Sequence, residues 1–274
     1  MRKKIISRVF LHALLFMLAI ITLFPFVYIV LIALGKNVIS TNTFIPEGFT
    51  LDNFKRLFTE TKFLNWLGNS LLIATLTMIA AVILVSVSVY VFSRLKFYGK
   101  RKLFNFVLLI QIFPLTLSMV SIFQIFVRLG LLNRMMGLVI VNCTLASAGL
   151  VMLAKGYFDS IPYEIDEAAM MDGASVFQIL TKITLPLAKP MLAIVAIQSF
   201  VIAYNEYTIA SAVMTTNVEA MPLAVGLQSM ITGQYGINWS IYCAGAVLGS
   251  IPMIILFYSL QKNFIGGLTE GGGK

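Results

Sequence analysis

Long apolar runs alternate with short polar segments along most of this chain. A helix needs about 20 apolar residues to cross the hydrocarbon core of a membrane. Six runs come close to that length, and each predicts a spanning helix: roughly 10–34, 69–92, 103–126, 137–155, 190–212 and 240–261. The pattern therefore predicts an all-α, polytopic membrane protein with about six transmembrane helices.

Polar residues and prolines interrupt several of these runs. Gln111 and Pro114 lie in the third and Asn142 lies in the fourth, so the edges of both are poorly defined. Pro25, Pro114 and Pro252 lie inside expected spans, where neighbouring groups can satisfy the carbonyls that a proline leaves free. The interruptions blur the bounds, but the expected number of spans remains six.

The distribution of Lys and Arg predicts the orientation. Fourteen of them fall on one side of the expected spans and six on the other. Because cytoplasmic loops carry the excess, the first side is expected inside, with both termini. The loop 213–239, expected outside, has no Lys or Arg. The first apolar run is long for a signal peptide and has no clear cleavage site, so we interpret it as a retained span.

Composition supports the membrane class. Of the 274 residues, 59% are hydrophobic and 11% are charged, against roughly 25% charged in soluble domains. The net charge of +9 does not indicate nucleic-acid binding, because the basic residues cluster beside apolar runs, as juxtamembrane charges do. Cys143 and Cys243 lie in apolar runs and are interpreted as buried hydrophobes.

The sequence contains few of the residues that enzyme active sites require. Its one histidine, His12, lies near the start of the first span, so neither a His-based triad nor a His metal cluster is expected. It also lacks the GxxxxGK[ST] loop that cradles nucleotide phosphates. No cofactor is therefore expected in this chain.

The expected cytoplasmic loop 156–189 is unusually acidic. Five of the eleven acidic residues fall between Asp159 and Asp172. Pro162 and Glu164 suit the first turn of a helix, where a carboxylate meets the positive end of the dipole. Glu164 and Glu167, three residues apart, share one helical face and are available to basic groups on a partner. Asp166 and Asp172 are interpreted as solvated charges.

A second helix is predicted after a turn. Gly173 can adopt the left-handed conformation that ends a helix. Ser175 and Gln178 form a capping-box pattern that starts the next one. Pro186 and Pro190 are expected to break the chain before the fifth span. The loop thus predicts a helix-turn-helix, which by itself could also be an amphipathic surface element without a partner.

The spacing within this loop resembles a known family. Glu167-Ala168-Ala169, Gly173 and Ile183-x-Leu185-Pro186 are similar to the EAA loop of ABC importer permeases. Four further segments resemble the carbohydrate branch: FLNWLGNSLLIA (63–74), LGLLNRMMGLVI (129–140), AYNEYTIA (203–210) and GGLTEGGGK (266–274). In the third of these, Tyr204 stands where the branch usually has Trp. The segment 221–252 looks most like maltose/maltodextrin permeases, and galacto-oligosaccharide permeases are similar.

The resemblance implies partners and a place in the cell. It implies a plasma-membrane protein of a bacterium or archaeon that works with two cytoplasmic ATPase subunits, which bind ATP and Mg²⁺. It also implies a second, usually different permease subunit, an extracytoplasmic sugar-binding protein and a sugar. Membrane lipid surrounds such a protein, and nucleic acid has no role. The residues expected to couple to the ATPase are Glu164, Glu167, Ala168, Ala169, Gly173, Ile183, Leu185 and Pro186.

Polar residues of the fifth span are candidates for the substrate path, because polar groups inside a membrane are costly. Glu206 is the one acid in any expected span, and it falls past the midplane toward the outside. Sugars are held by amides and carboxylates on their hydroxyls and by aromatic rings on their apolar faces. The candidates are Gln198, Tyr204, Asn205, Glu206 and Tyr207. The alternative is that these groups bond between helices and fix packing.

Three regions are expected. Residues 1–68 hold the first span and an external loop, 69–262 form the permease core with the EAA loop 159–186, and 263–274 form a Gly-rich cytoplasmic tail. The tail is either a flexible segment that packs against the ATPase or simply disordered. An ion-coupled secondary transporter would predict internal repeats, and an ion channel would predict a filter-like segment. Neither feature is evident in the sequence.

Overall fold

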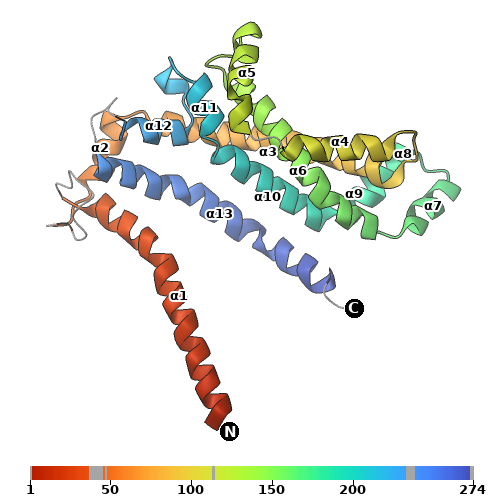
Figure 1. Ribbon diagram of the computed structural model, residues 1–274, viewed down its shortest axis with the longest axis horizontal. Helices are drawn as coiled ribbons and strands as arrows, with labels where there is room; N and C mark the ends of the chain where they lie inside the picture. Colours follow the sequence, from red (N-terminus) through yellow and green to blue (C-terminus); the bar gives the residue numbers. More distant parts are fainter. Residues whose placement is uncertain (1, 37–45, 47, 113–114, 233–237, 272–274) are drawn as a thin grey trace. The chain divides into compact units, whose positions relative to one another are not determined.

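The computed structural model describes residues 2–36, 46, 48–112, 115–232 and 238–271, and most of them are helical (Figure 1). Within these ranges the β-structure is an isolated bridge between Gly35 and Phe49, so the all-α prediction is confirmed. The longer helices are α1 (Arg2–Leu34), α3 (Phe63–Arg94), α6 (Met135–Ser160), α10 (Lys189–Tyr204) and α13 (Trp239–Gly271). The shorter ones are α2 (Asp52–Glu60), α4 (Lys100–Ile112), α5 (Leu115–Arg128), α7 (Tyr163–Met171), α8 (Val176–Ile179), α9 (Leu185–Leu187), α11 (Thr208–Val213) and α12 (Leu223–Ser229).

Five stretches of the described residues are long and apolar enough to cross a membrane. They are Phe10–Leu34, Phe63–Arg94, Met135–Ser160, Lys189–Val213 and Trp239–Ser259, and they correspond to the first, second, fourth, fifth and sixth expected spans. Within the third, 103–126, the structure describes α4 and α5. These two helices flank position 114, a proline outside the described residues.

The chain forms two compact units, residues 1–64 with 226–251 and residues 65–225 with 252–274. In the first unit, Asn53 on α2 joins that helix to the end of α1. Its Nδ2 donates to the carbonyl of Ala33 at 2.8 Å and to that of Gly35 at 2.9 Å. The tail expected from residue 263 continues α13 as far as Gly271, and residues 272–274 lie outside the described ranges.

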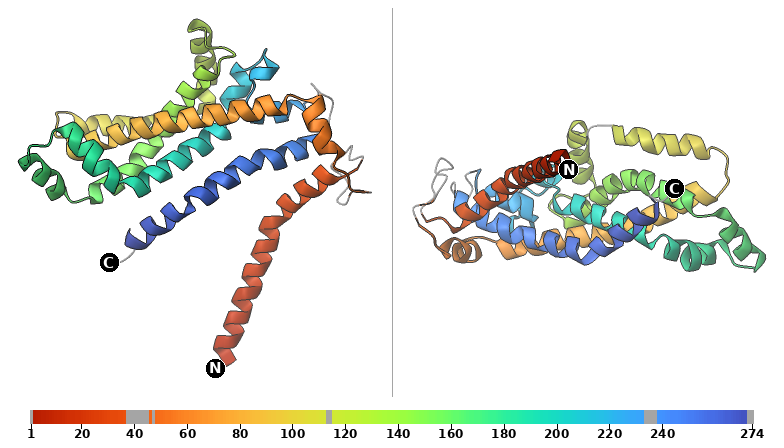
Figure 2. Two further views of the ribbon diagram at one scale, coloured as in Figure 1. Left: turned by 180° about the vertical axis from the view of Figure 1, so that it is seen from behind. Right: turned by 90° about the horizontal axis from the view of Figure 1, so that it is seen from below.

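In the second unit, α10 lies beside α6, and both pack in one core with α3 (Figure 2). Their shared core contains Val85, Val89 and Phe92 from α3, Ala146, Leu150, Val151, Ala154 and Phe158 from α6, and Met191 and Val195 from α10. Ala146 and Ala154 are small enough to let the helix backbones approach closely, which is how helices associate in membranes. This core fixes the end of α6, from which the acidic loop continues, next to the end of α3.

The first turns of α3 hold a distant loop. Trp66 Nε1 donates to the carbonyl of Val218 at 2.7 Å, and Asn69 Nδ2 donates to that of Glu219 at 2.7 Å. Ser70 Oγ accepts the amide N–H of Leu223 at 2.7 Å. Positions 66, 69 and 70 share one helical face. Hydrogen bonds from the segment 63–74 therefore fix the position of the loop that leads into α12.

The segment 129–140 holds the preceding part of the same loop. Asn133 has a φ of 57°, a left-handed conformation that Asn adopts more readily than most residues. Its Oδ1 accepts the amide N–H of Thr215 at 2.9 Å and that of Thr216 at 3.1 Å. Two segments that the sequence singled out by resemblance thus converge on residues 213–223.

Candidate functional site

The acidic loop forms the two helices that its sequence predicts. The first, α7, ends at Met171, and the amide N–H of Asp172 donates to Ala168 O at 3.1 Å. Gly173 follows with a φ of 83°, and its N–H donates to Met170 O at 3.0 Å. This is a left-handed helix end, as predicted for Gly173.

The predicted capping box also forms. The amide N–H of Gln178 donates to Ser175 Oγ at 3.3 Å, and the amide N–H of Ser175 donates to Gln178 Oε1 at 2.8 Å. Two amides at the start of α8 are satisfied in this way, so its first turn is stabilised locally. The turn and the cap together set the direction of α8 relative to α7.

The prolines do not break the chain as predicted. A π-helical turn, η1 (Leu180–Thr184), follows α8, and α9 and α10 continue with Ala188 alone between them. Pro186 and Pro190 each lie in the first turn of a helix. At Pro190, in the first turn after Ala188, a missing N–H costs little because it would have no partner within α10. The second half of the loop is therefore a nearly continuous helical lead into the fifth span.

One face of the loop packs against the end of α3. Ala169, Ile179 and Leu180 are buried together with Tyr90 of α3. Ile183 and Leu185 are half-buried against this cluster, whereas Pro186 is exposed. The expected coupling residues thus form two groups. Ala169, Ile183 and Leu185 attach the loop to α3, whereas Pro186 is exposed.

A buried ion pair joins α7 to α3. Arg94 Nε lies 2.8 Å from Asp166 Oδ2, and the exposed fractions of the two side chains are 6% and 1%. The Nε–H bond does not point along that line, so this is an ion pair rather than an aligned hydrogen bond. Arg94 also donates from Nη2 to Ile161 O at 2.8 Å, and its guanidinium lies 5.7 Å from the ring centre of Tyr163.

The prediction that Asp166 is a solvated charge is wrong. Asp166 lies three residues before the buried Ala169, so both occupy the inward face of α7. That spacing was a signal for burial, but nothing in the sequence pairs Asp166 with Arg94, which is 72 positions away. Asp172, by contrast, is exposed.

The outward face of the loop combines acidic and apolar side chains. Glu164, Glu167 and Ala168 are exposed. Met171 is 89% exposed and Phe177 is 72% exposed. Large apolar side chains left open beside free carboxylates are typical of a surface that binds another protein. We call Glu164, Glu167, Met171 and Phe177 the outward face below.

One substrate-path candidate lies on an exposed face of α10, and a second caps the C-terminal end of that helix. Gln198 and Asn205 are both exposed and seven residues apart, with the exposed Ile202 between them. This spacing puts all three on one side of the helix. Tyr204 is buried, and its ring stacks on that of Phe200 at a centroid distance of 5.8 Å.

Glu206 lies in the break between α10 and α11. Its Oε1 accepts the amide N–H of Ile209 at 2.6 Å, and its Oε2 accepts that of Ala210 at 2.9 Å. The carboxylate therefore caps α11, where it satisfies two first-turn amides and meets the positive end of the helix dipole. Tyr207 beside it is exposed. Whether any of these residues contacts a sugar stays a prediction.

In the part of the chain that the structure describes, no group of three or more His, Cys, Asp or Glu side chains could hold a metal ion. Cys143 and Cys243 are buried and free. That ATP and Mg²⁺ bind to a partner chain stays a prediction.

Comparison with known proteins gives a consistent result. The model of the family described as binding-protein-dependent transport system inner membrane component matches residues 91–269. The maltodextrin transport system permease protein MdxG of Bacillus subtilis (strain 168) is 40% identical over 82% of this chain and 81% of its own. The galactooligosaccharides transport system permease protein GanQ of the same strain is 34% identical over 99% of this chain and 97% of its own. A crystal structure of a bacterial ABC transporter involved in the import of the acidic polysaccharide alginate superposes with a TM-score of 0.80, at 26% identity over 96% of this chain and 98% of that one.

Proposed function

The chain belongs to the family of binding-protein-dependent transport system inner membrane components, and from this membership we propose that it is a permease subunit of an ATP-driven oligosaccharide importer. The similar relatives MdxG and GanQ are named as permeases for maltodextrin and for galactooligosaccharides. Maltodextrins are the first candidate substrate, because MdxG has the higher identity to this chain. Galacto-oligosaccharides are the second, because the similarity to GanQ extends over 99% of this chain.

The observation that supports coupling is the division of the acidic loop into two faces. Its inward face is buried against α3 and joined to it by Arg94 and Asp166. Its outward face presents Met171 and Phe177 to the surroundings. We assign the outward face to a cytoplasmic ATPase subunit, and the inward attachments transmit the movement of that subunit to α3 and α10. A packed helical element can pass on a rigid-body displacement, whereas a slack loop would absorb it.

The same reasoning supports the other partners. A family named as binding-protein-dependent implies a solute-binding protein on the outer side of the membrane. The exposed side of α10 with Gln198, Ile202 and Asn205 is assigned to the solute path or to a second permease subunit. If the acidic loop faces the ATPase, the excess of Lys and Arg on the same side supports the proposal that both termini are cytoplasmic.

Uptake into vesicles tests this function. The full chain is reconstituted with a candidate second permease, ATPase and binding protein from the same organism, and labelled maltodextrin is added outside. Uptake should require ATP inside and the binding protein outside, and vanadate should abolish it. Uptake that an ion gradient drives without ATP would refute the importer. ATP-dependent uptake of labelled galacto-oligosaccharides, in vesicles that do not take up labelled maltodextrin, would select the second substrate.

A further inference from the structure

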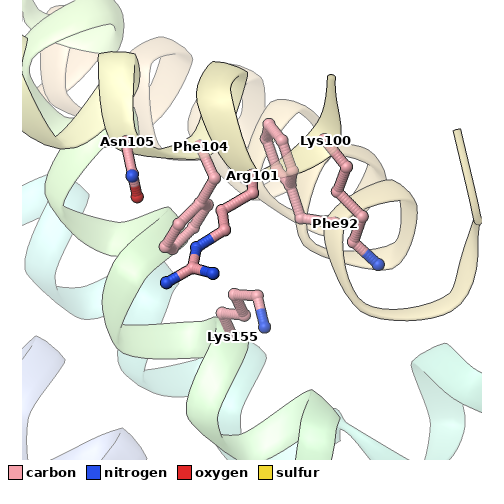
Figure 3. Close-up of a pocket in the computed structure, with 6 residues that line it drawn as sticks. All are labelled: Phe92, Lys100, Arg101, Phe104, Asn105 and Lys155. Carbon is pink, nitrogen blue, oxygen red and sulfur yellow. The ribbon is translucent and has the colours of Figure 1, made fainter. Parts of the chain in front are cut away.

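A basic pocket lies at the end of the second unit where α3 and α6 finish (Figure 3). Its volume is about 390 Å³, which falls in the range of roughly 300–1,000 Å³ for small-molecule sites. The lining residues come from α3, α4 and α6: Phe92, Lys100, Arg101, Phe104, Asn105 and Lys155. Three of these six are cations, one is an amide and two are aromatic.

The charges in the pocket are not neutralised by the residues that the structure describes. Lys155 pairs with Asp159, and its Nζ lies 5.6 Å from the ring centre of Phe104. Lys100 Nζ donates to Leu95 O, a neutral carbonyl, at 3.0 Å. Arg101 is exposed and has neither an ion pair nor a hydrogen bond in the described ranges. Three cations against one carboxylate leave an excess of two positive charges, and Arg101 is the group free to meet an anion.

The side chains are arranged to converge. Figure 3 shows the guanidinium of Arg101 extending from α4 toward Lys155 on α6, with the ring of Phe104 beside it. An anion between Arg101 and Lys155 would accept from both, and Asn105 adds an amide to the same pocket. Guanidinium binds phosphate oxygens in a two-pronged geometry, and an ammonium adds a point charge. The chemistry of the pocket therefore fits a phosphate group.

The position of the pocket favours a lipid as the source of that phosphate. The span in α3 ends at Arg94, two residues after Phe92, and Lys155 lies in the last two turns of the span in α6. The pocket is thus at the boundary between the apolar helices and the loops. On α4, Leu103, Phe106 and Leu109 are exposed, so an apolar surface leads away from the cations. A phosphate carried on acyl chains would contact both parts, whereas free phosphate would use the cations alone.

We propose that the pocket formed by Arg101, Lys155 and Phe104 binds the phosphate headgroup of an anionic phospholipid. Basic pockets between transmembrane helices on the cytoplasmic side suit such headgroups, and the charge count predicts that this end is cytoplasmic. Phe92 also packs in one core with Phe158 and Ile161. A bound lipid would therefore add contacts at the same end of α3 and α6 from which the acidic loop emerges.

Native mass spectrometry of the full chain, purified in the complex it forms, tests the proposal. Phosphatidylglycerol or phosphatidylcholine is added in steps, and the bound fraction gives an apparent Kd for each lipid. The test variant is Arg101→Gln with Lys155→Gln. The matched control is Lys96→Gln with Lys102→Gln, which removes two exposed cations of the same region that do not line the pocket. Thermal unfolding of both variants checks that each remains folded.

The expected result is that the test variant weakens phosphatidylglycerol binding about tenfold, while the control changes it less than about twofold and phosphatidylcholine binding is unaffected. A tenfold change corresponds to 1.4 kcal/mol. Equal loss in both variants would overturn the proposal, because it would show only a general attraction to positive charge. Binding of inorganic phosphate with the same dependence on Arg101 would also overturn it, by identifying free phosphate as the ligand. So would phosphatidylglycerol binding to the complex no tighter than that of phosphatidylcholine, by showing that the pocket in the assembled complex does not recognise an anionic headgroup.

Discussion

Arg94 Nε lies 2.8 Å from Asp166 Oδ2, and both side chains are almost fully buried. The contact joins the last residue of α3 to α7, the first helix of the acidic loop. Desolvating two charges is expensive, so a buried pair of this kind adds little net stability compared with apolar residues of similar size. Its effect is instead on position, because removing either partner leaves the other charge buried and unopposed. The pair thus fixes where α7 attaches to the spans.

Asp166→Asn is therefore expected to lower the free energy of unfolding by about 3 kcal/mol, since Arg94 would remain buried without a counter-charge. Arg94→Met combined with Asp166→Leu should recover most of this loss, because no buried charge remains. Thermal or denaturant unfolding of the purified chain measures both effects, and a double-mutant cycle isolates the pair. Asp172→Asn is the matched control, because Asp172 is an exposed acid of the same loop.

The same variants separate stability from coupling. If the pair positions α7 for the ATPase, the double variant should be stable yet transport less sugar for each ATP hydrolysed. Normal stability of Asp166→Asn would contradict the burial of the pair. Full transport by the double variant would contradict its positioning role.

The acidic loop shows how far local sequence signals reach. Gly173, Ser175 and Gln178 act through bonds to residues within three or four positions, so their patterns predicted the turn and the capping box correctly. The prolines misled because proline is compatible with the first turn of a helix as well as with a break. At Pro186 the helix continues directly from a π-turn instead of breaking. No residue type in the sequence predicts a π-turn.

Contacts between residues far apart in the chain could not be predicted from the sequence, for a different reason. The bonds of Trp66 to Val218 and of Asn133 to Thr215 join residues far apart in the chain, as does the Arg94–Asp166 pair. A single sequence contains the polarity of each partner but not the identity of the other. Hydropathy predicted where the spans lie, whereas the packing of the spans decides which polar groups meet.

Gly173→Val is expected to abolish uptake while membrane insertion remains normal. Nothing lies within 4 Å of a Cβ added at this position, so the effect comes from the φ of 83° alone. A β-branched residue strongly disfavours that conformation, and the chain would relax by changing the angle between α7 and α8. Uptake in vesicles and the amount of protein in the membrane fraction measure the two consequences separately.

Two control variants accompany Gly173→Val. Gly173→Asn should keep most activity, because Asn tolerates the left-handed region. Gly156→Ala, at a helical position of α6 that is equally open, should leave uptake intact and raise stability by roughly 0.5–1 kcal/mol. Normal uptake by Gly173→Val would show that the turn does not determine coupling.

Glu206→Gln should lower stability more than it changes substrate affinity. Both carboxylate oxygens accept amide bonds at the start of α11, and replacing them with one amide oxygen is expected to cost about 1 kcal/mol. We expect KM for uptake to change less than about threefold. Asn205→Ala is the comparison, since Asn205 is exposed at the C-terminal end of α10 and a rise in KM there would support the solute path. A tenfold rise in KM for Glu206→Gln, with unchanged thermal stability, would instead make Glu206 a substrate ligand.

Glu164→Gln combined with Glu167→Gln should weaken binding of the ATPase subunit about tenfold, while it lowers the free energy of unfolding by no more than about 1 kcal/mol. Both carboxylates are exposed on the outward face and form no bond within the described residues, so the fold loses only the interaction of Glu164 with the dipole of α7. Carboxylates at the rim of an interface act mainly on association rate and salt dependence. The affinity of the purified permease for the ATPase, measured at low and at high salt, should therefore differ between wild type and variant chiefly at low salt.

Asp172→Asn removes one charge beside this face and should reduce affinity less than about twofold. Equal effects from Asp172→Asn and the double variant would mean that the loop attracts the ATPase by general charge, and the outward face would lose its assignment.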